Sequence, residues 1–420
     1  MPRSVQLHRN GLPSQPAYLR AFNALGRALA RLGLDRPQLE VEALLAHATR
    51  RTKLDDFGDE SYLAGLRQLI EELNRSAELS QTGRLVAYLN TLDHLCVRLR
   101  LIEARKQRAE IAEQNIEQPL FILGLPRTGT TILFELIAQD PAFRSPASWE
   151  VSRPLPPPRE TDYNTDPRIR SVDRLLALME KLAPGFRVIH ALGARLPQEC
   201  VYLMASNFVS EQFGYMYNVP GYRNWALEQD MTATYQWHAQ FLQHLQVDYS
   251  AERWVLKTPA HLAYLPALHA RYPDAAIVWT HRRPLQAVAS FASLTTTLRS
   301  GFSDAVDPQA AGAFEMDHCA RIVGRGMAAR DALEAERFHD VSFADICRDP
   351  IAVIDGIYRH YGWVLRPEAE GAMRDYLRNH PRNLYGVHRY SAAEFGLTEA
   401  QERERFADYL GRYGRFCAEG

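Results

Sequence analysis

After an extended arm of about 16 residues with little periodicity, apolar residues recur every three or four positions to about residue 115, a spacing typical of amphipathic helices. The pattern predicts three helices, the last of which runs from about Arg84 to Gln114. Their apolar stripes comprise Leu19, Phe22, Leu25, Leu29 and Leu32 in the first helix, Tyr62, Leu66, Leu69, Ile70 and Leu73 in the second, and Leu85, Tyr88, Leu89, Leu92, Leu95, Leu99 and Ile102 in the third. Gly33 is a typical stop for the first helix. We therefore expect residues 1–115 to form an all-helical extension.

After Pro119 the pattern changes to short, continuous apolar runs separated by helical stretches. Residues 120–123 and 275–279 are such runs, which are typical of strands buried on both faces. Strands that alternate with helices imply a parallel, doubly wound sheet. The predicted fold class is therefore α/β. It combines a P-loop-like parallel sheet flanked by helices, over residues 116–420, with the N-terminal helical extension.

The composition is that of an ordinary soluble protein, with 46% hydrophobic and 24% charged residues. Because 49 basic residues balance 50 acidic ones, no overall charge attracts nucleic acid or an anionic membrane. The 5 cysteines are scattered and form no CxxC pair, which argues against a disulfide framework or a structural zinc ion. We found no apolar leader and no long apolar run. We expect a cytoplasmic protein with no nucleic-acid partner and no integral membrane segment.

Residues 124–131 read GLPRTGTT and lie between the first apolar run and a helical pattern. This is the GxxxxGK[ST] frame of a phosphate-binding P-loop, with Thr130 in place of the lysine. Amides at a helix N-terminus can hold a phosphate because they are unpaired and the helix dipole adds positive charge. The residues expected to line the phosphate are Pro126, Arg127, Thr128, Gly129, Thr130 and Thr131. A tight glycine turn without a ligand is the alternative.

A second basic segment follows the second apolar run. His281, Arg282 and Arg283 stand at the carboxyl end of that predicted strand, where open α/β sheets bind ligands. Arg282 can make a charged, bidentate contact with a phosphate, and Ser290 can supply a hydroxyl to the same group. Two anion sites suit a nucleotide with phosphates at both ends, and a solvated basic turn is the alternative. The lack of a magnesium-binding aspartate here disfavours metal-dependent ATP or GTP chemistry.

The two motifs resemble those of the sulfotransferases that use 3′-phosphoadenosine 5′-phosphosulfate (PAPS), in particular a bacterial group with an LPRTGTT loop and an HRxPxxxxxS second site. The resemblance runs from about Pro119 to the C-terminal segment. It implies that PAPS is the co-substrate, with its 5′-phosphosulfate on the first loop and its 3′-phosphate on Arg282 and Ser290. It also implies direct in-line transfer without a metal. The RKG-type third contact of animal members is not visible, and Arg389 or His388 is the expected substitute.

Lys257, His261 and Glu199 are the candidates for the reacting groups. Lys257 ends a predicted strand and is placed to bridge the sulfuryl group and the leaving phosphate, while His261 follows in the first turn of a helix, where the dipole favours its neutral form. Animal members of the family have a lysine and a histidine in a similar KTH sequence. Glu199 is either the base or the partner that orients His261, and Glu150 is a weaker candidate. Surface positions for Lys257 and His261, and a helix-start role for Glu199, are the alternatives.

The acceptor side is marked by closely spaced aromatic residues that either wall an apolar pocket or belong to the core. These are Phe208, Phe213, Tyr215, Tyr217, Tyr222 and Trp225, and we assign about half of them to the core. Residues 295–309 predict a loop long enough to cover a bound substrate and to exclude water from it.

The sequence thus predicts a sulfotransferase that moves a sulfuryl group from PAPS to a hydroxyl or amine of a partly apolar acceptor, either a small molecule or lipid-like. The helical extension would cap the site or form a homodimer contact. Two other functions stay open. A P-loop kinase or nucleotide hydrolase would turn over ATP with magnesium, and a non-catalytic nucleotide-binding protein would bind without transfer.

Overall fold

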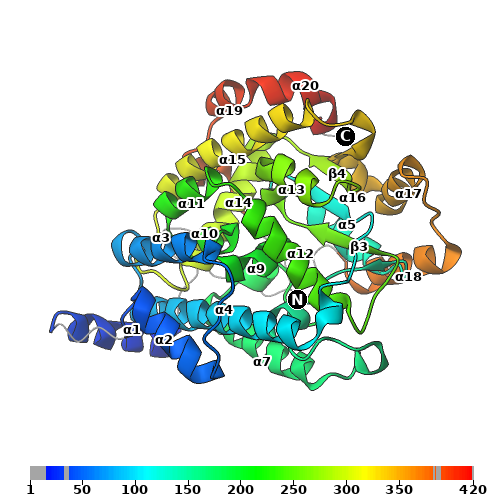
Figure 1. Cartoon of the computed structure of the whole chain (residues 1–420). Coiled ribbons are helices and arrows are strands. Elements are labelled where there is room, and N and C mark those ends of the chain that lie inside the picture. Colours follow the sequence, from blue (N-terminus) through cyan, green and yellow to red (C-terminus); the bar gives the residue numbers. More distant parts are fainter. Residues whose placement is uncertain (1–15, 33–36, 382–383, 385–388, 419–420) are drawn as a thin grey trace.

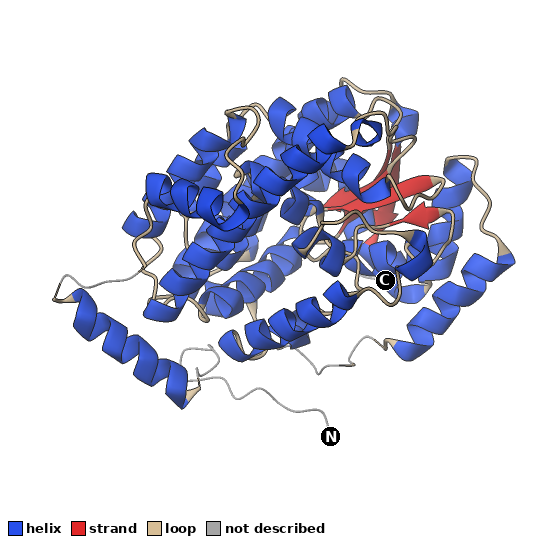
Figure 2. Ribbon diagram, turned by 60° about the horizontal axis from the view of Figure 1, so that its bottom comes forward, coloured by secondary structure: helices blue, strands red, loops and turns tan. Residues whose placement is uncertain are grey.

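The structure is a computed structural model of the 420-residue chain, and it describes residues 16–32, 37–381, 384 and 389–418. Its centre is a sheet of 5 strands in the order β2-β3-β1-β4-β5, all parallel. The strands are β1 (Leu120–Gly124), β2 (Phe143–Arg144), β3 (Arg253–Lys257), β4 (Ala276–His281) and β5 (Phe338–Ser342). Figure 2 shows helices on both sides of the sheet. The predicted fold class is therefore confirmed.

Two of the predicted strands are the neighbours β1 and β4, which pair from Leu120 with Ala276 to Gly124 with Thr280. Because all strands run in the same direction, the carboxyl ends of β1, β3 and β4 open onto one edge of the sheet. The P-loop follows β1, Lys257 ends β3, and the segment that contains Arg282 follows β4. The topology therefore gathers these three parts of the predicted site at one edge.

Alternate residues of β1 enter two different hydrophobic cores, as the pleat of a strand requires. Leu120 and Ile122 pack with apolar residues of helices α5, α17 and α18 on one face. Phe121 and Leu123 join the larger cluster on the other face. The helices that follow the P-loop are α5 (Thr130–Ile137), α6 (Ser148–Ser152), α7 (Pro167–Leu182), α8 (Phe186–Ile189), α9 (Cys200–Met204), α10 (Glu211–Met216), α11 (Pro220–Leu227), α12 (Thr232–Gln246), α13 (Leu265–Arg271), α14 (Pro284–Arg299), α15 (Pro308–Arg330), α16 (Phe343–Arg348), α17 (Pro350–His360), α18 (Pro367–Asn379), α19 (Glu399–Arg405) and α20 (Ala407–Cys417).

The N-terminal region is helical, as predicted, and it contains one helix more than expected. Its helices are α1 (Ala17–Ala30), α2 (Val41–Thr52), α3 (Ser61–Arg75) and α4 (Gln81–Gln107). Figure 1 shows α1 and α2 at the end of the molecule that is remote from the sheet. Leu66 of α3 and Leu95 of α4 nevertheless belong to the same buried cluster as Phe121 of β1. The hydrophobic core is thus continuous from the N-terminal helices to the sheet.

The predicted apolar stripe of α1 lies mostly on the surface. Only Leu19 is buried, and the exposed stripe residues are Phe22, Leu25, Leu29 and Leu32. The buried face of α1 instead includes Asn23, whose side-chain oxygen accepts a hydrogen bond from the backbone of Thr82 at 2.9 Å. A polar contact with α4 therefore fixes the rotation of α1 about its axis. The apolar spacing alone did not indicate this rotation.

In the described part of the chain, every helix is too short or too polar to cross a membrane.

The loop predicted at residues 295–309 is shorter than expected. Helix α14 continues to Arg299 and α15 begins at Pro308, so only the residues between them are non-helical. Arg299 fixes the end of α14 because its guanidinium donates to the carbonyl of Gly214 at 2.6 Å. Residues 295–303 are all buried. The part of the predicted loop that is neither helical nor packed in the core is therefore limited to residues 304–307.

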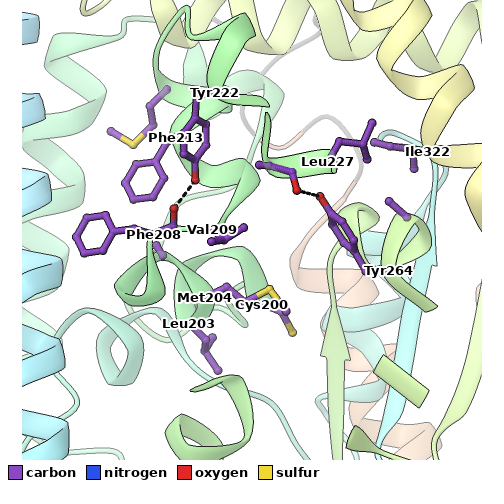
Figure 3. Packing of buried hydrophobic residues seen from close by; sticks show 14 of the residues in the cluster. Cys200, Leu203, Met204, Phe208, Val209, Phe213, Tyr222, Leu227, Tyr264 and Ile322 are labelled. Carbon is purple, nitrogen blue, oxygen red and sulfur yellow. Dashed lines mark hydrogen bonds between the residues drawn. The ribbon is translucent and has the colours of Figure 1, made fainter. Parts of the chain in front are cut away.

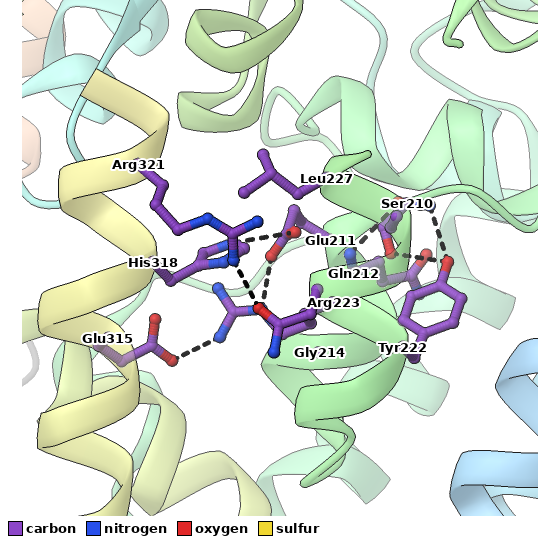
Figure 4. A network of polar contacts seen from close by, with 12 residues as sticks. Ser210, Glu211, Gln212, Gly214, Tyr222, Arg223, Leu227, Glu315, His318 and Arg321 are labelled. Atoms are coloured by element: carbon purple, nitrogen blue, oxygen red, sulfur yellow. Dashed lines mark hydrogen bonds and ion pairs between the residues drawn. The ribbon is translucent and has the colours of Figure 1, made fainter. Parts of the chain in front are cut away.

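Arg299 belongs to a buried network of ion pairs that joins α10, α11, α14 and α15. Figure 4 shows the part of the network around Arg223. Arg223 lies at its centre and donates to Glu211 at 2.7 Å and to Glu315 at 2.6 Å. His318 lies 3.2 Å from Glu211. All these side chains are at most 4% exposed. Each buried charge of the network therefore has a partner of opposite charge.

Gly83 allows α4 to start directly against the end of α14. A Cβ atom at this position would lie 1.8 Å from the carbonyl oxygen of Phe302, which also accepts a hydrogen bond from Ser80 at 2.9 Å. We expect Gly83→Ala to lower the free energy of unfolding by about 1–3 kcal/mol, because the two backbones must move apart. Urea denaturation measures this loss. Gly371→Ala is the matched control, since nothing surrounds that helical position, and it should stabilise the protein by up to about 1 kcal/mol. A loss of stability in both variants would contradict the packing explanation.

Candidate active site

The P-loop turns sharply between β1 and α5, and two glycines make the turn possible. Gly124 has φ of 144° and Gly129 has φ of 92°, values that favour glycine. A Cβ atom on Gly124 would lie 2.4 Å from the carbonyl oxygen of Thr280 in β4. Helix α5 begins at Thr130, so its free N-terminal amides lie at the edge where the central strands end. This arrangement suits a phosphate or a sulfate.

The threonines of the loop have different surroundings. The hydroxyl of Thr128 donates to the carbonyl of Leu125 at 2.7 Å and lies 2.6 Å from the hydroxyl of Thr280. It therefore ties the loop to β4, although we had expected it to face a ligand. Thr130 is buried, whereas Thr131 is half-buried and lies 3.2 Å from the ammonium of Lys257.

The P-loop and the second cationic segment meet in one place. The guanidinium of Arg127 donates to the hydroxyl of Ser290 at 3.2 Å, and that of Arg282 donates to the carbonyl of Arg127 at 3.0 Å. Arg282 also lies over the ring of Phe343, 4.2 Å from its centre. Burial lowers the pKa of Arg127, and the nearby charge of Arg282 adds to this effect. An anion in this region would relieve the repulsion between the two guanidinium groups.

Lys257, Glu199 and Thr131 form the second half of the site. Lys257 ends β3 and is 2% exposed, and its ammonium forms an ion pair with Glu199, the residue just before α9. The hydroxyl of Thr258 donates to the other oxygen of Glu199 at 3.2 Å. Burial is the largest single effect and raises the pKa of Glu199, but the surrounding charges and hydrogen bonds, first of all the charge of Lys257, together bring the pKa below the usual 4.5. The carboxylate is therefore ionised at neutral pH.

His190 belongs to the same group of residues, and sequence reasoning missed it. Burial lowers its pKa to about 4, and the charges of Glu199, Lys257 and Arg127 all act on it. It follows α8, whose carbonyl of Ile189 accepts a hydrogen bond from Arg127 at 3.3 Å. No motif surrounds His190 in the sequence, so only the fold could identify it.

Residues 119–367 match the profile of a family described as the sulfotransferase family. This match covers more than half of the chain. The chain belongs to the sulfotransferase family. It is therefore a transferase enzyme, as the motifs predicted.

Two solved structures of sulfotransferases are similar over nearly their whole length. Sulfotransferase STF1 from Mycobacterium tuberculosis is 34% identical with a TM-score of 0.79, over 88% of this chain and 98% of that one. Sulfotransferase STF9 from Mycobacterium avium is 29% identical with a TM-score of 0.81, over 90% of this chain and 97% of that one. No curated protein sequence matches the chain.

His261 does not join Lys257 and Glu199 in this sulfotransferase. It is 1% exposed, and its Nδ1 lies 2.7 Å from the hydroxyl of Tyr235. Its ring packs edge-on against Phe121 of β1, with ring centres 5.0 Å apart. The 3-10 helix η4 (Pro259–Tyr264) thus turns His261 into the core, and the partners of Glu199 are Lys257 and Thr258 instead. The base therefore has to be sought among other residues.

The remaining candidates of the sulfotransferase lie outside this group. Glu150 is buried and forms an ion pair with Arg144, and it accepts a hydrogen bond from the backbone of Ala147 at 2.7 Å, which is a structural arrangement. Arg389 is exposed and follows residues outside the described part of the chain, which include His388. The third phosphate contact therefore stays a prediction.

The aromatic residues expected on the acceptor side divide into two groups. Phe208, Phe213, Tyr217 and Tyr222 are at most 2% exposed and belong to the core. Figure 3 shows Phe208, Phe213 and Tyr222 packed together, with the hydroxyl of Tyr222 donating to the carbonyl of Phe208 at 2.8 Å. Tyr215 and Trp225 are half-buried.

Proposed function

We propose that the protein transfers the sulfuryl group of PAPS to a hydroxyl or an amine of a partly apolar acceptor. The observation that carries this proposal is the contact between the two cationic segments, in which Arg282 binds the carbonyl of Arg127 and Arg127 binds Ser290. The 5′-phosphosulfate and the 3′-phosphate of PAPS are attached to one ribose, so the two anions lie close together. Adjoining anion sites at one sheet edge suit such a ligand.

The donor would lie along this edge. The amides of residues 126–131 and the side chain of Arg127 would hold the 5′-phosphosulfate, because the N-terminus of α5 provides unpaired N–H groups there. Arg282 and Ser290 would hold the 3′-phosphate, and Arg389 would supply a third contact. Arg127 and Lys257 supply the positive charge that neutralises the leaving phosphate, the task that magnesium performs in nucleotide hydrolases.

We assign the role of base to Glu199. The carboxylate accepts the proton of the acceptor's hydroxyl, the acceptor oxygen forms a bond to sulfur, and the bond between sulfur and the 5′-phosphate oxygen breaks. The products are a sulfate ester and 3′-phosphoadenosine 5′-phosphate (PAP). Lys257 lies between Glu199 and Thr131 of the P-loop, where it can stabilise the leaving phosphate. The donor's oxygens compete with Glu199 for the ammonium, which raises the proton affinity of the carboxylate when the donor binds.

The acceptor would approach Glu199 between partly buried tyrosines. Burial raises the pKa of both Tyr202 and Tyr215, and the charge of Glu199 adds to the effect on each. His190 lies near the same carboxylate in its neutral form. This lining of aromatic carbon with a few polar atoms suits an acceptor that is partly apolar.

Calorimetric titration with PAP and with 5′-AMP tests the proposal. We expect the parent protein to bind PAP about 10- to 100-fold more tightly, because the 3′-phosphate gains charged hydrogen bonds. The variant Arg282→Ala should lose this preference. Arg283→Ala is the matched control and should keep it, since that guanidinium pairs with Glu399 and Glu402 on α19.

Equal affinity of the parent protein for PAP and 5′-AMP would overturn the assignment of the second anion site. ATP turnover that requires magnesium would instead favour a kinase or a nucleotide hydrolase. Binding of PAPS without transfer to any of a range of phenols, alcohols and amines would favour a non-catalytic nucleotide-binding protein.

A further inference from the structure

Three side chains of metal-binding type meet in the core behind β1. Cys200 begins α9, His238 lies in α12, and His261 lies in η4. Their potential ligand atoms all lie within 4.8 Å of one another. The side chains are at most 1% exposed, and Phe121 of β1 packs against both imidazole rings. Figure 3 shows Cys200 among the surrounding apolar side chains.

Each imidazole has one nitrogen bound and one nitrogen free. Nδ1 of His261 lies 2.7 Å from the hydroxyl of Tyr235, and Nδ1 of His238 lies 2.7 Å from the hydroxyl of Tyr272. The Nε2 atoms of both rings are buried and have no hydrogen-bond partner. Buried polar atoms in native proteins are nearly always paired, so two free nitrogens beside one thiol need an explanation. A shared ligand would satisfy both at once.

We propose that Cys200, His238 and His261 bind one Zn²⁺ ion through the thiolate and the two Nε2 atoms. Zinc favours thiolate and imidazole ligands at about 2.3 and 2.0 Å, which places the ligand atoms about 3.3–3.8 Å apart. The three side chains therefore need to close by about 1 Å. Binding releases the thiol proton of Cys200 to solvent.

The surroundings match those of a structural metal site. The hydroxyls of Tyr235 and Tyr272 would each accept a hydrogen bond from the Nδ1 of one histidine. Such a bond fixes the orientation of the imidazole ring and leaves its Nε2 free for the metal, as in other zinc-binding histidines.

The ion would connect the two segments that carry the proposed reacting groups. Cys200 directly follows Glu199, and His261 follows Lys257 by four positions. His238 adds an anchor in α12, which packs against α9 and α13. By binding Cys200 and His261, zinc would thus fix the distance between Glu199 and Lys257. It takes no part in the transfer itself.

Elemental analysis of the purified protein tests this site independently of any sulfotransferase activity. We expect about one zinc ion per chain in the parent protein and less than about a tenth of that in Cys200→Ala and His238→Gln. Cys319→Ala is the matched control, because that cysteine is equally buried but lies in α15, and it should retain zinc. A loss of zinc in the control, or copper in place of zinc in the parent, would overturn the assignment.

Refolding of the parent protein tests for zinc binding without any substitution, so it remains informative if the variants do not fold. Protein refolded with zinc should melt at a higher temperature than protein refolded with a chelator. Protein refolded with Co²⁺ should show the absorption of a thiolate bound to tetrahedral cobalt. If zinc leaves the melting temperature unchanged and cobalt gives no thiolate band, the cluster binds no metal and the proposal fails.

Discussion

Replacement of Lys257 by methionine will lower kcat about 10²- to 10³-fold, the usual cost of removing a charge that stabilises a transition state. The change should also leave a signature in the pH dependence of the residual activity. The charge of Lys257 is the largest of the effects that together hold the pKa of Glu199 below 4.5 against the opposing effect of burial. Without Lys257, burial dominates and the pKa rises. The acidic limb of kcat/KM, which reports the free enzyme, should therefore move to higher pH.

Steady-state kinetics with PAPS over a range of pH measures both effects. Lys181→Met is the matched control, because that lysine is exposed near the end of α7, and it should behave as the parent does. A Lys257→Met variant that keeps its kcat would contradict the role of this cation. If kcat falls but the acidic limb stays in place, Glu199 is not the base.

Replacement of Arg223 by methionine will lower the free energy of unfolding by about 3–5 kcal/mol. The guanidinium lies between the carboxylates of Glu211 and Glu315, and all three side chains are at most 4% exposed. Methionine fills a similar volume but leaves two negative charges in the core without their shared partner. His318 and Arg299 reach one carboxylate each, at 3.2 and 3.5 Å, and these longer contacts compensate only in part.

Chemical denaturation with urea gives the size of this loss. Arg321→Met makes the same substitution at an exposed ion pair with Glu228, where surface screening limits the cost to less than about 1 kcal/mol. Similar losses in the two variants would show that the buried network contributes no more than a surface pair does.

The parts of the fold that the sequence predicted well are those that local patterns control. β1 and β4 are buried on both faces, and their residues are apolar or glycine except for Thr280 and His281 at the end of β4, so their strand character is visible directly. The P-loop requires positive φ at Gly124 and Gly129, and this requirement is visible as glycine spacing. By contrast, β2 has only 2 residues, and it exists because Phe143 and Arg144 pair with β3, a contact distant in the sequence.

The same distinction applies to the site. Lys257 ends β3 and Arg282 directly follows β4, and both strands were predicted, so the place of these residues at the sheet edge followed from topology. His261 stands close to Lys257 in the sequence, but its direction depends on the 3-10 turn of η4 and on the hydroxyl of Tyr235, which a helical pattern cannot reveal. His190 reaches the site through packing of α8 against Arg127, without any local signal.

The shared core of the N-terminal helices and the sheet has a consequence for how the chain folds. Residues 61–107 cover the aromatic side chains of Phe208 and Phe213, which would otherwise face water. Neither part can reach its native packing before the other, so heat should melt both in one cooperative transition. Cleavage of the chain between α4 and β1, followed by separation of the two fragments, would expose apolar surface on both, and each fragment should aggregate.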